Sequence, residues 1–196
     1  MTTNNEAIQA DGLDTCQHNG GMHGLRLVRP GAAYVDAIWD YRTESLADAP
    51  HMNGACDLED IDDPCAWIAH CQALADPATV PEGHVQAEEW LLMRGDDPRI
   101  LGMVNLRAQL DEYMSEYAGH IGYSVRPSER GRGLGRTQLL LALGRCREIG
   151  LDRVLITCEE DNVASQRTAE SCGAVFERAT FDESDGVMMR RYWVRL

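Results

Sequence analysis

The sequence predicts one mixed α/β (α+β) domain of six to seven strands and about four helices. Short segments of alternating or β-branched residues, which are typical of strands, are interspersed with longer segments of helical periodicity. The 196 residues are enough for one hydrophobic core of ordinary size. No internal repeat and no linker-like segment divides the chain, so we assign residues 25–196 to one domain.

Residues 1–24 are polar and rich in glycine. They have neither the basic start nor the apolar run of a signal peptide. We therefore predict that they form a polar N-terminal tail outside the core.

The first predicted elements are a strand and two helices. Residues 25–29 alternate and stop at Pro30, which ends a strand. Residues 32–47 place their apolar side chains on one helical face. Asp63 and Pro64 are suited to the N-cap and the first position of a second helix.

The middle of the chain predicts three strands. Residues 85–93 and 99–106 form a hairpin around a Gly-Asp-Asp-Pro turn. Residues 111–118 are polar and are expected to form a loop over the sheet, and residues 119–125 are expected to form the third strand of this group.

The C-terminal third predicts two helices and three strands. A helix over 136–149 ends at a glycine C-cap, and a β-branched central strand follows at 153–158. A short helix over 162–172 leads to a final antiparallel pair at 174–180 and 187–194.

The charge of the chain limits its partners. Acidic residues outnumber basic residues by 32 to 18, which gives a net charge of −14. Every basic residue is arginine, and the absence of lysine excludes a Walker A phosphate loop. Such a surface repels nucleic acid and anionic membranes, and no segment approaches the roughly 20 apolar residues of a membrane span. We therefore predict no nucleic-acid and no membrane partner; the charge either favours a cationic substrate or serves solubility.

The cysteines do not indicate a disulfide framework or a metal site. There are seven of them, and none forms a Cys-x-x-Cys pair. Cys65 and His70 lie near Cys71, but they point in different directions on a helix. Without an export signal we predict reduced thiols in a cytoplasmic protein that holds no metal.

Residues 124–135, Ser-Val-Arg-Pro-Ser-Glu-Arg-Gly-Arg-Gly-Leu-Gly, are the most informative segment. A strand ends at a proline, three glycines follow at every second position, and a helix then begins. Glycine lets backbone N–H groups converge on a ligand that approaches closely, and the helix N-terminus adds partial positive charge. Four arginines surround the segment and reverse the local sign of charge; they are Arg126, Arg130, Arg132 and Arg136. The pattern predicts a site for a polyphosphate.

A dinucleotide-binding fold does not fit this segment. The spacing Gly131-x-Gly133-x-Gly135 departs from G-x-G-x-x-G because the sixth position is Arg136. About sixty residues follow that position, too few to complete such a fold. A glycine-rich turn with solvated arginines is the other interpretation.

The sequence resembles the Gcn5-related N-acetyltransferase (GNAT) superfamily. Arg130-x-x-Gly133-x-Gly135 matches its acetyl-CoA signature, [QR]-x-x-G-x-[GA], and residues 162–173 resemble the motif that follows it. The resemblance covers residues 119–194. Within this family, the sequence is similar to a branch of uncharacterised predicted acetyltransferases. The resemblance implies a single-domain GNAT fold with a central mixed, mostly antiparallel twisted sheet flanked by helices, and it favours a homodimer over a monomer.

The resemblance also implies where acetyl-CoA, the co-substrate, would lie. The pyrophosphate would lie on the backbone amides of the loop, the pantetheine arm beside the preceding strand, and the far side against the short C-terminal helix. The predicted cofactor-binding residues are Ser124, Val125, Arg130, Gly131, Arg132, Gly133, Leu134, Gly135, Arg136, Thr137, Asn162 and Ser165. Asn162 could equally serve as a helix N-cap.

Acetyl transfer to an amine needs a base, because an alkylammonium has a pKa of about 10 and so carries its proton at neutral pH. His120 is the candidate base, and a hydrogen-bonded structural role is the alternative. Tyr117 is expected to line the acceptor site. Many relatives use a tyrosine seven residues after the asparagine as general acid, but Ala169 occupies that position here. The acid is then Ser165, another tyrosine or water.

Three functions agree with these residues. The first is an acetyl-CoA-dependent N-acetyltransferase that acts on a primary amine of a small-molecule or amino-acid-like acceptor by direct attack in a ternary complex. The second is an acetyltransferase for a protein N-terminus or side chain. The third is a non-catalytic acyl-CoA-binding module.

Overall fold

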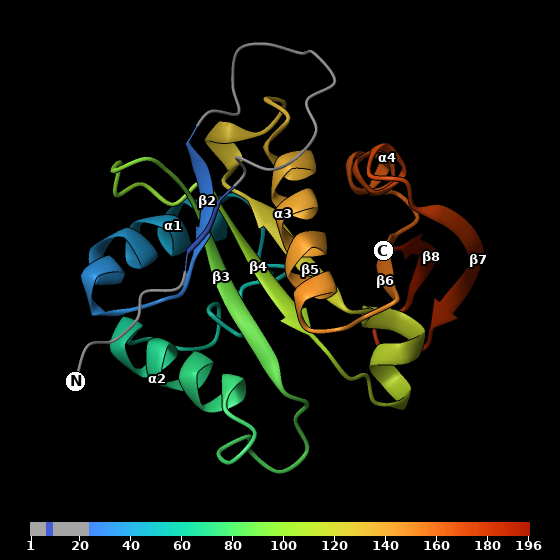
Figure 1. Cartoon of the computed structure of the whole chain (residues 1–196), viewed down its shortest axis with the longest axis horizontal. Coiled ribbons are helices and arrows are strands. Elements are labelled where there is room, and N and C mark those ends of the chain that lie inside the picture. The colour runs from blue at the N-terminus through green and yellow to red at the C-terminus, as the bar shows by residue number, and fades with distance from the viewer. Residues whose placement is uncertain (1–6, 10–23) are drawn as a thin grey trace.

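The computed structural model describes residues 7–9 and 24–196, whose strands form two antiparallel sheets (Figure 1). The larger sheet has the order β1-β2-β3-β4-β5, with Ala7–Gln9 (β1), Leu25–Val28 (β2), Ala87–Arg94 (β3), Gly102–Arg107 (β4) and Ile121–Val125 (β5). The smaller sheet has the order β6-β8-β7, with Arg153–Glu159 (β6), Val175–Asp182 (β7) and Val187–Arg195 (β8). The predicted mixed α/β domain with mostly antiparallel strands is confirmed.

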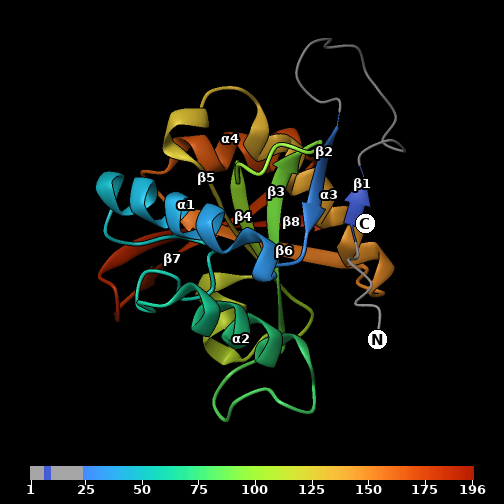
Figure 2. The same ribbon diagram turned by 90° about the vertical axis from the view of Figure 1, so that its left-hand side faces the viewer.

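Within the described residues, four α-helices cover the sheets. They are Val35–Asp48 (α1), Pro64–Ala75 (α2), Leu134–Glu148 (α3) and Val163–Ser171 (α4). The helices α1 and α2 lie on one face of the larger sheet and α3 lies on the other, as Figure 2 shows with α1 and α2 toward the viewer. The helix α4 lies over the smaller sheet (Figure 1). None of the described helices is both long and apolar enough to cross a membrane.

Two hydrophobic cores result from this arrangement, and β3 contributes to both. Trp90 and Leu92 belong to the core under α3, whereas Leu91 and Met93 belong to the core under α1 and α2. Successive side chains of a strand point to opposite faces, so a strand that is covered on both faces needs apolar residues at every position. This double burial makes the larger sheet a rigid support, and β5 forms its edge nearest to the smaller sheet.

The two sheets meet at a short seam and then diverge. At the seam, the His120 N–H donates to the Leu155 carbonyl over 2.8 Å, and Gly119 forms an isolated bridge with Ile156. Beyond the seam, β5 and β6 belong to different sheets. The two strands therefore enclose a wedge.

The edge of β5 that faces the wedge has backbone groups available for a ligand. The Arg107 N–H donates to the His120 carbonyl and the Arg126 N–H donates to the Leu101 carbonyl, so the even-numbered residues of β5 bond to β4. Because bonding directions alternate along a strand, Tyr123 and Val125 direct their N–H and C=O groups toward the wedge, where the Val125 carbonyl accepts from the Arg130 Nε over 3.3 Å.

Two segments differ from their predicted form. The expected loop at residues 111–118 contains a π-helical turn, Met114–Ala118, so that prediction was wrong. The Asp111 carboxylate accepts from the Met114 N–H over 2.7 Å and starts the turn. A single helical turn of polar residues has no hydrophobic periodicity by which the sequence could predict it. Within the predicted N-terminal tail, β1 pairs with β2, while residues 1–6 and 10–23 lie outside the described residues.

Candidate active site

The loop between β5 and α3 forms an anion-binding geometry. Gly131 and Gly133 both adopt left-handed backbone conformations, with φ of 76° and 79°, which favour glycine. Gly133 is the N-cap of α3 and supplies no side chain to the N–H groups of the first turn. A Cβ built on either glycine meets no atom within 4 Å. The space above these amides is therefore open to an anionic ligand.

A cleft of about 630 Å³ lies above this loop. Its walls are the loop, the end of β5, the segment after α1 and the start of α4. Ten of the twelve predicted cofactor-binding residues line it: Ser124, Val125, Arg130, Gly131, Gly133, Leu134, Gly135, Arg136, Asn162 and Ser165. The other two, Arg132 and Thr137, do not line the cleft, and the Thr137 hydroxyl donates to the Gly133 carbonyl over 3.4 Å.

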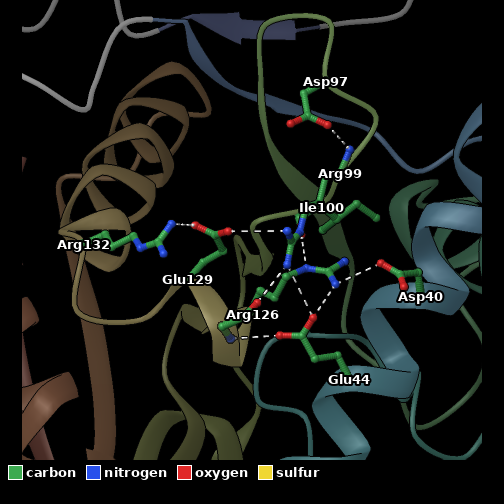
Figure 3. A network of polar contacts seen from close by, with 9 residues as sticks. Asp40, Glu44, Asp97, Arg99, Ile100, Arg126, Glu129 and Arg132 are labelled. Carbon is green, nitrogen blue, oxygen red and sulfur yellow. Dashed lines mark hydrogen bonds and ion pairs between the residues drawn. The ribbon is translucent and has the colours of Figure 1, made fainter.

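Arg126 does not face the cleft, and the expectation that it surrounds a phosphate was wrong. Its side chain is 1% exposed and points to α1, where Nη1 contacts Asp40 at 2.9 Å and Glu44 at 2.7 Å (Figure 3). Its Nε donates to the Ile100 carbonyl over 2.6 Å. Burial works to raise the pKa of Glu44, but hydrogen bonds from Ser128 and from the Arg126 guanidinium outweigh it and lower that pKa to about 2. Arg126 thus holds α1 against the sheet.

Two arginines of the loop have carboxylate partners. Arg130 contacts Asp48 over 2.7 Å, and Arg132 contacts the largely buried Glu129 over 2.8 Å (Figure 3). Both carboxylates also line the cleft. The positive charge that the sequence predicts is therefore partly neutralised, and the backbone amides provide the unopposed part of the anion site.

The start of α4 forms another wall of the cleft. The Asn162 Oδ1 accepts from the Ser165 N–H over 3.0 Å, so Asn162 is the N-cap of α4. The Ser165 hydroxyl forms a 3.0 Å hydrogen bond with the Tyr123 hydroxyl, which reaches it from β5. Asn162, Ser165 and Tyr123 therefore form a bridge of polar side chains across the wedge.

A second cavity, of about 520 Å³, adjoins the cleft on the far side of this bridge. It shares with the cleft the residues His51, Asn53, Tyr123, Asn162 and Ser165. Four carboxylates line it, Glu59, Glu159, Asp182 and Asp185, together with Arg107. We call this cavity the acidic chamber.

Several groups of the acidic chamber have defined partners. The Glu59 Oε1 accepts from the Met52 N–H over 3.1 Å, whereas its Oε2 is buried and has no partner within the described part of the chain. The Tyr113 hydroxyl donates to Asp182 over 2.8 Å. Burial, together with this carboxylate, raises the pKa of Tyr113. Tyr117 also lines the chamber, at the position expected for a residue of the acceptor site.

His120 lies behind the acidic chamber, in the seam between the sheets. It is 9% exposed, its Nδ1 accepts from the Leu155 N–H over 3.0 Å, and its ring meets Trp193 edge to face at 6.2 Å. Burial lowers its pKa, and Arg153 and Arg107 add to this effect. His120 lines neither cavity. This position favours the structural interpretation of His120 over that of a base.

Sequence reasoning did not find the side chains that come from the segment between α1 and α2. Gly54 packs so closely on β5 that a Cβ at this position would clash with the backbone of Gly122 and Tyr123. This contact brings His51, Asn53 and Glu59 to the two cavities. No spacing rule connects them with residues seventy positions later, so the sequence carries no signal for this part of the site.

Residues 29–175 match the family model described as the acetyltransferase (GNAT) domain. The chain belongs to the GNAT family. The match includes the whole glycine loop and both of its flanking elements, β5 and α3. The resemblance noted in the sequence is confirmed.

Solved structures share the GNAT fold at low sequence identity. The ribosomal-protein-S5-alanine acetyltransferase from Vibrio fischeri superposes with a TM-score of 0.68 at 14% identity, over 91% of this chain and 97% of that one. The microcin C7 self-immunity acetyltransferase MccE, in complex with acetyl-CoA and AMP, gives 0.65 at 17% identity, over 88% and 93%. RimJ of Mycobacterium smegmatis, in complex with CoA-disulfide, gives 0.64 at 17%, over 87% and 81%. These likenesses establish the fold.

A curated relative is more similar over a short stretch. The mycothiol acetyltransferase of Thermobispora bispora is 46% identical over 67 residues, which are 34% of this chain and 21% of the relative. The chain thus matches about a fifth of that protein's length.

Within residues 7–9 and 24–196, no group of three or more His, Cys, Asp or Glu side chains is arranged to hold a metal ion.

Proposed function

We propose that this GNAT domain transfers the acetyl group of acetyl-CoA to the primary amine of a small, positively charged acceptor, by direct attack in a ternary complex. The observation that supports this proposal best is the contact between the cleft and the acidic chamber. The two cavities have a common wall of five residues, so a donor in one and an acceptor in the other would meet there.

The cleft suits acetyl-CoA because backbone groups face it at both ends, with the Val125 carbonyl already accepting from the Arg130 Nε over 3.3 Å. The first-turn amides of α3 would hold the pyrophosphate, and the edge of β5 would bond to the amide groups of the pantetheine arm. The N–H groups of Tyr123 and Val125 point to the wedge, where one of them could hold the thioester carbonyl oxygen as negative charge develops on it. MccE and RimJ, which share this fold, are described with acetyl-CoA and CoA-disulfide.

The acidic chamber suits a cationic acceptor. Four carboxylates and one guanidinium line it, so the chamber attracts ammonium groups and repels carboxylates. Glu59 lines the chamber, and its buried Oε2, which has no partner within the described residues, would have to turn toward an entering ammonium to accept a hydrogen bond or a proton from it. We propose Glu59, rather than His120, as the group that receives this proton, because Glu59 lines the chamber.

A protein N-terminus is the second candidate acceptor. The V. fischeri relative is named as a ribosomal-protein-S5-alanine acetyltransferase, and a peptide N-terminus also carries an ammonium group. A peptide and a small amine would therefore use the same charge of the chamber, and only turnover distinguishes them.

The test compares three four-carbon primary amines that differ only at the far end: 1,4-diaminobutane (cationic), butylamine (neutral) and 4-aminobutanoate (anionic). Short peptides with free N-termini form a fourth arm. We expect kcat/KM, measured by release of CoA thiol, to fall in that order for the three amines, by about tenfold per step, which is the effect of one partly buried charge pair. Higher turnover with peptides than with the diamine would select the second candidate.

The variant Glu59→Gln removes one charge from the chamber and should reduce the preference for the diamine over butylamine. Glu148→Gln is the matched control, because Glu148 is 53% exposed at the end of α3, pairs with Arg145 and lines neither cavity. Equal or better turnover with 4-aminobutanoate would contradict a cationic acceptor. Absence of turnover with every amine and peptide would favour the binding module.

A further inference from the structure

The position where many GNAT enzymes carry a tyrosine acid is filled by Ala169, which is fully buried in the core under α3 and α4. A methyl group cannot give a proton to a departing thiolate. We propose that Tyr123, which enters from β5 on the opposite side of the wedge, is the general acid of the acetyl transfer and that Ser165 supplies its proton. The inference rests on the proposed function.

The Tyr123 hydroxyl lies where the two cavities meet. Tyr123 and Ser165 line both the cleft and the acidic chamber, and their hydroxyl oxygens are 3.0 Å apart. The Tyr123 ring lies between the two helices: a Cβ at Gly135 of α3 would be 3.8 Å from its Cε2 and 3.6 Å from Thr168 of α4. An acetyl group that passes from donor to acceptor crosses this bridge, so the phenol would contact the reacting atoms.

The environment keeps the phenol protonated at neutral pH. Burial raises the pKa of Tyr123, against the opposing effect of hydrogen bonds from Ser165 and Thr168. A phenol with a pKa above its ordinary value of about 10 is a hydrogen-bond donor at pH 7. It can therefore stabilise a thiolate, whose conjugate thiol has a pKa of about 8.5, as the negative charge develops.

The step balances without a further reactant. The neutral amine attacks the thioester carbon, a C–N bond forms, and one N–H proton leaves through the acidic chamber. The tetrahedral intermediate collapses, the C–S bond breaks and its electron pair stays on sulfur. The Tyr123 hydroxyl proton moves to that sulfur, and Ser165 returns a proton to the phenolate and regains one from solvent. The products are the N-acetylated amine and the CoA thiol.

The other tyrosines near the cavities are less well placed. The Tyr113 hydroxyl is committed to Asp182, and Tyr117 lines only the chamber. The Tyr41 hydroxyl is 3.0 Å from the Ser124 hydroxyl, which lies on the opposite face of β5 from Tyr123. Tyr123 is therefore the phenol that faces donor and acceptor together.

The first test is Tyr123→Phe, which removes the hydroxyl and keeps the ring. We expect kcat to fall about 100-fold, the lower end for a positioned acid, while the Kd for acetyl-CoA from titration calorimetry changes by less than about twofold. Tyr34→Phe is the control, because Tyr34 lies away from both cavities. Thermal melts of both variants check the fold. Near-normal kcat in Tyr123→Phe would overturn the inference.

The second test separates an acid from a structural hydroxyl. Incorporation of 3,5-difluorotyrosine at position 123 keeps the hydroxyl and lowers its pKa, so the descending limb of the kcat–pH profile should move to lower pH. An unmoved limb would overturn the inference even if Tyr123→Phe is slow. Both tests use the best amine of the series above. Turnover that is insensitive to both changes refutes only the role of Tyr123, whereas wild-type protein inactive with every acceptor refutes the proposed function as well.

Discussion

The cleft above the glycine loop and the acidic chamber share a wall, yet they are built in different ways. The anion end of the cleft is made by backbone amides of one continuous segment, Gly131 to Arg136. The chamber is made by side chains from five separate parts of the chain, represented by Glu59, Arg107, Tyr117, Glu159 and Asp182. Recognition by the backbone requires glycines at fixed spacing and so leaves a local pattern in the sequence. Recognition by assembled side chains leaves none.

The largest expected effect comes from blocking the backbone site. Gly133→Asp forces an L residue into a left-handed conformation and places a negative charge at the anion site. We expect the Kd for acetyl-CoA to rise by about 100-fold or more, since strain and repulsion together cost about 3 kcal/mol.

Titration calorimetry measures this effect, and Gly144→Asp in the middle of α3 is the control, since a Cβ there also meets no atom within 4 Å. An unchanged Kd in Gly133→Asp would remove the glycine loop from the cofactor site. The distinction between the two cavities would then lose its basis.

A smaller effect is expected from the arginines of the same loop. Arg132 is 63% exposed, is paired with Glu129 and does not line the cleft. We therefore expect Arg132→Ala to weaken acetyl-CoA binding by less than about tenfold, on the order of 1 kcal/mol. A loss as large as that of Gly133→Asp would mean that the cleft, like the chamber, depends on charged side chains.

The smallest effect on turnover is expected from the seam. His120→Gln can keep an acceptor for the Leu155 N–H, so kcat/KM should stay within about threefold of wild type with an unchanged pH profile. A general base would instead be worth about 10²- to 10⁴-fold. A loss of that size, with loss of an ascending limb, would restore His120 as the base.

The same variant has a pH-dependent effect on stability. Burial lowers the folded-state pKa of His120, so the wild type loses stability as the pH falls from about 6.5 through that lowered value. Glutamine does not titrate. In thermal melts, the Tm of His120→Gln relative to that of the wild type should therefore rise as the pH falls from 8 to 5.

The sequence predicted the parts of this molecule that depend on local pattern. The strand, glycine loop and helix from β5 to α3, and the N-cap Asp63 of α2, each follow from a pattern among neighbouring residues. The role of Arg126 was missed, although the alternation of side chains along β5 could have predicted it. Gly122, Ser124 and Arg126 lie on the same face, which is the face toward α1. The same alternation puts Tyr123 on the face toward α3 and α4.

The chamber could not be predicted in the same way. Glu59 and Asp182 line the same chamber because Gly54 packs on β5 and because β7 lies against the π-helical turn. Each of these is a tertiary contact between residues far apart in the chain. An excess of acidic residues was visible in the composition, but its concentration around one cavity was not.

The seam at Gly119 and His120 is the apex of the angle that β5 and β6 enclose. A small change in the angle between β5 and β6 produces a displacement that grows with distance from the seam. A shift of a few tenths of an ångström at the seam would therefore open or narrow the far end of the wedge by more. The cleft and the chamber both use β5 as a wall, and both would change together. Under the proposed function, the separate walls would tune donor and acceptor binding independently, whereas the apex would set the distance between donor and acceptor.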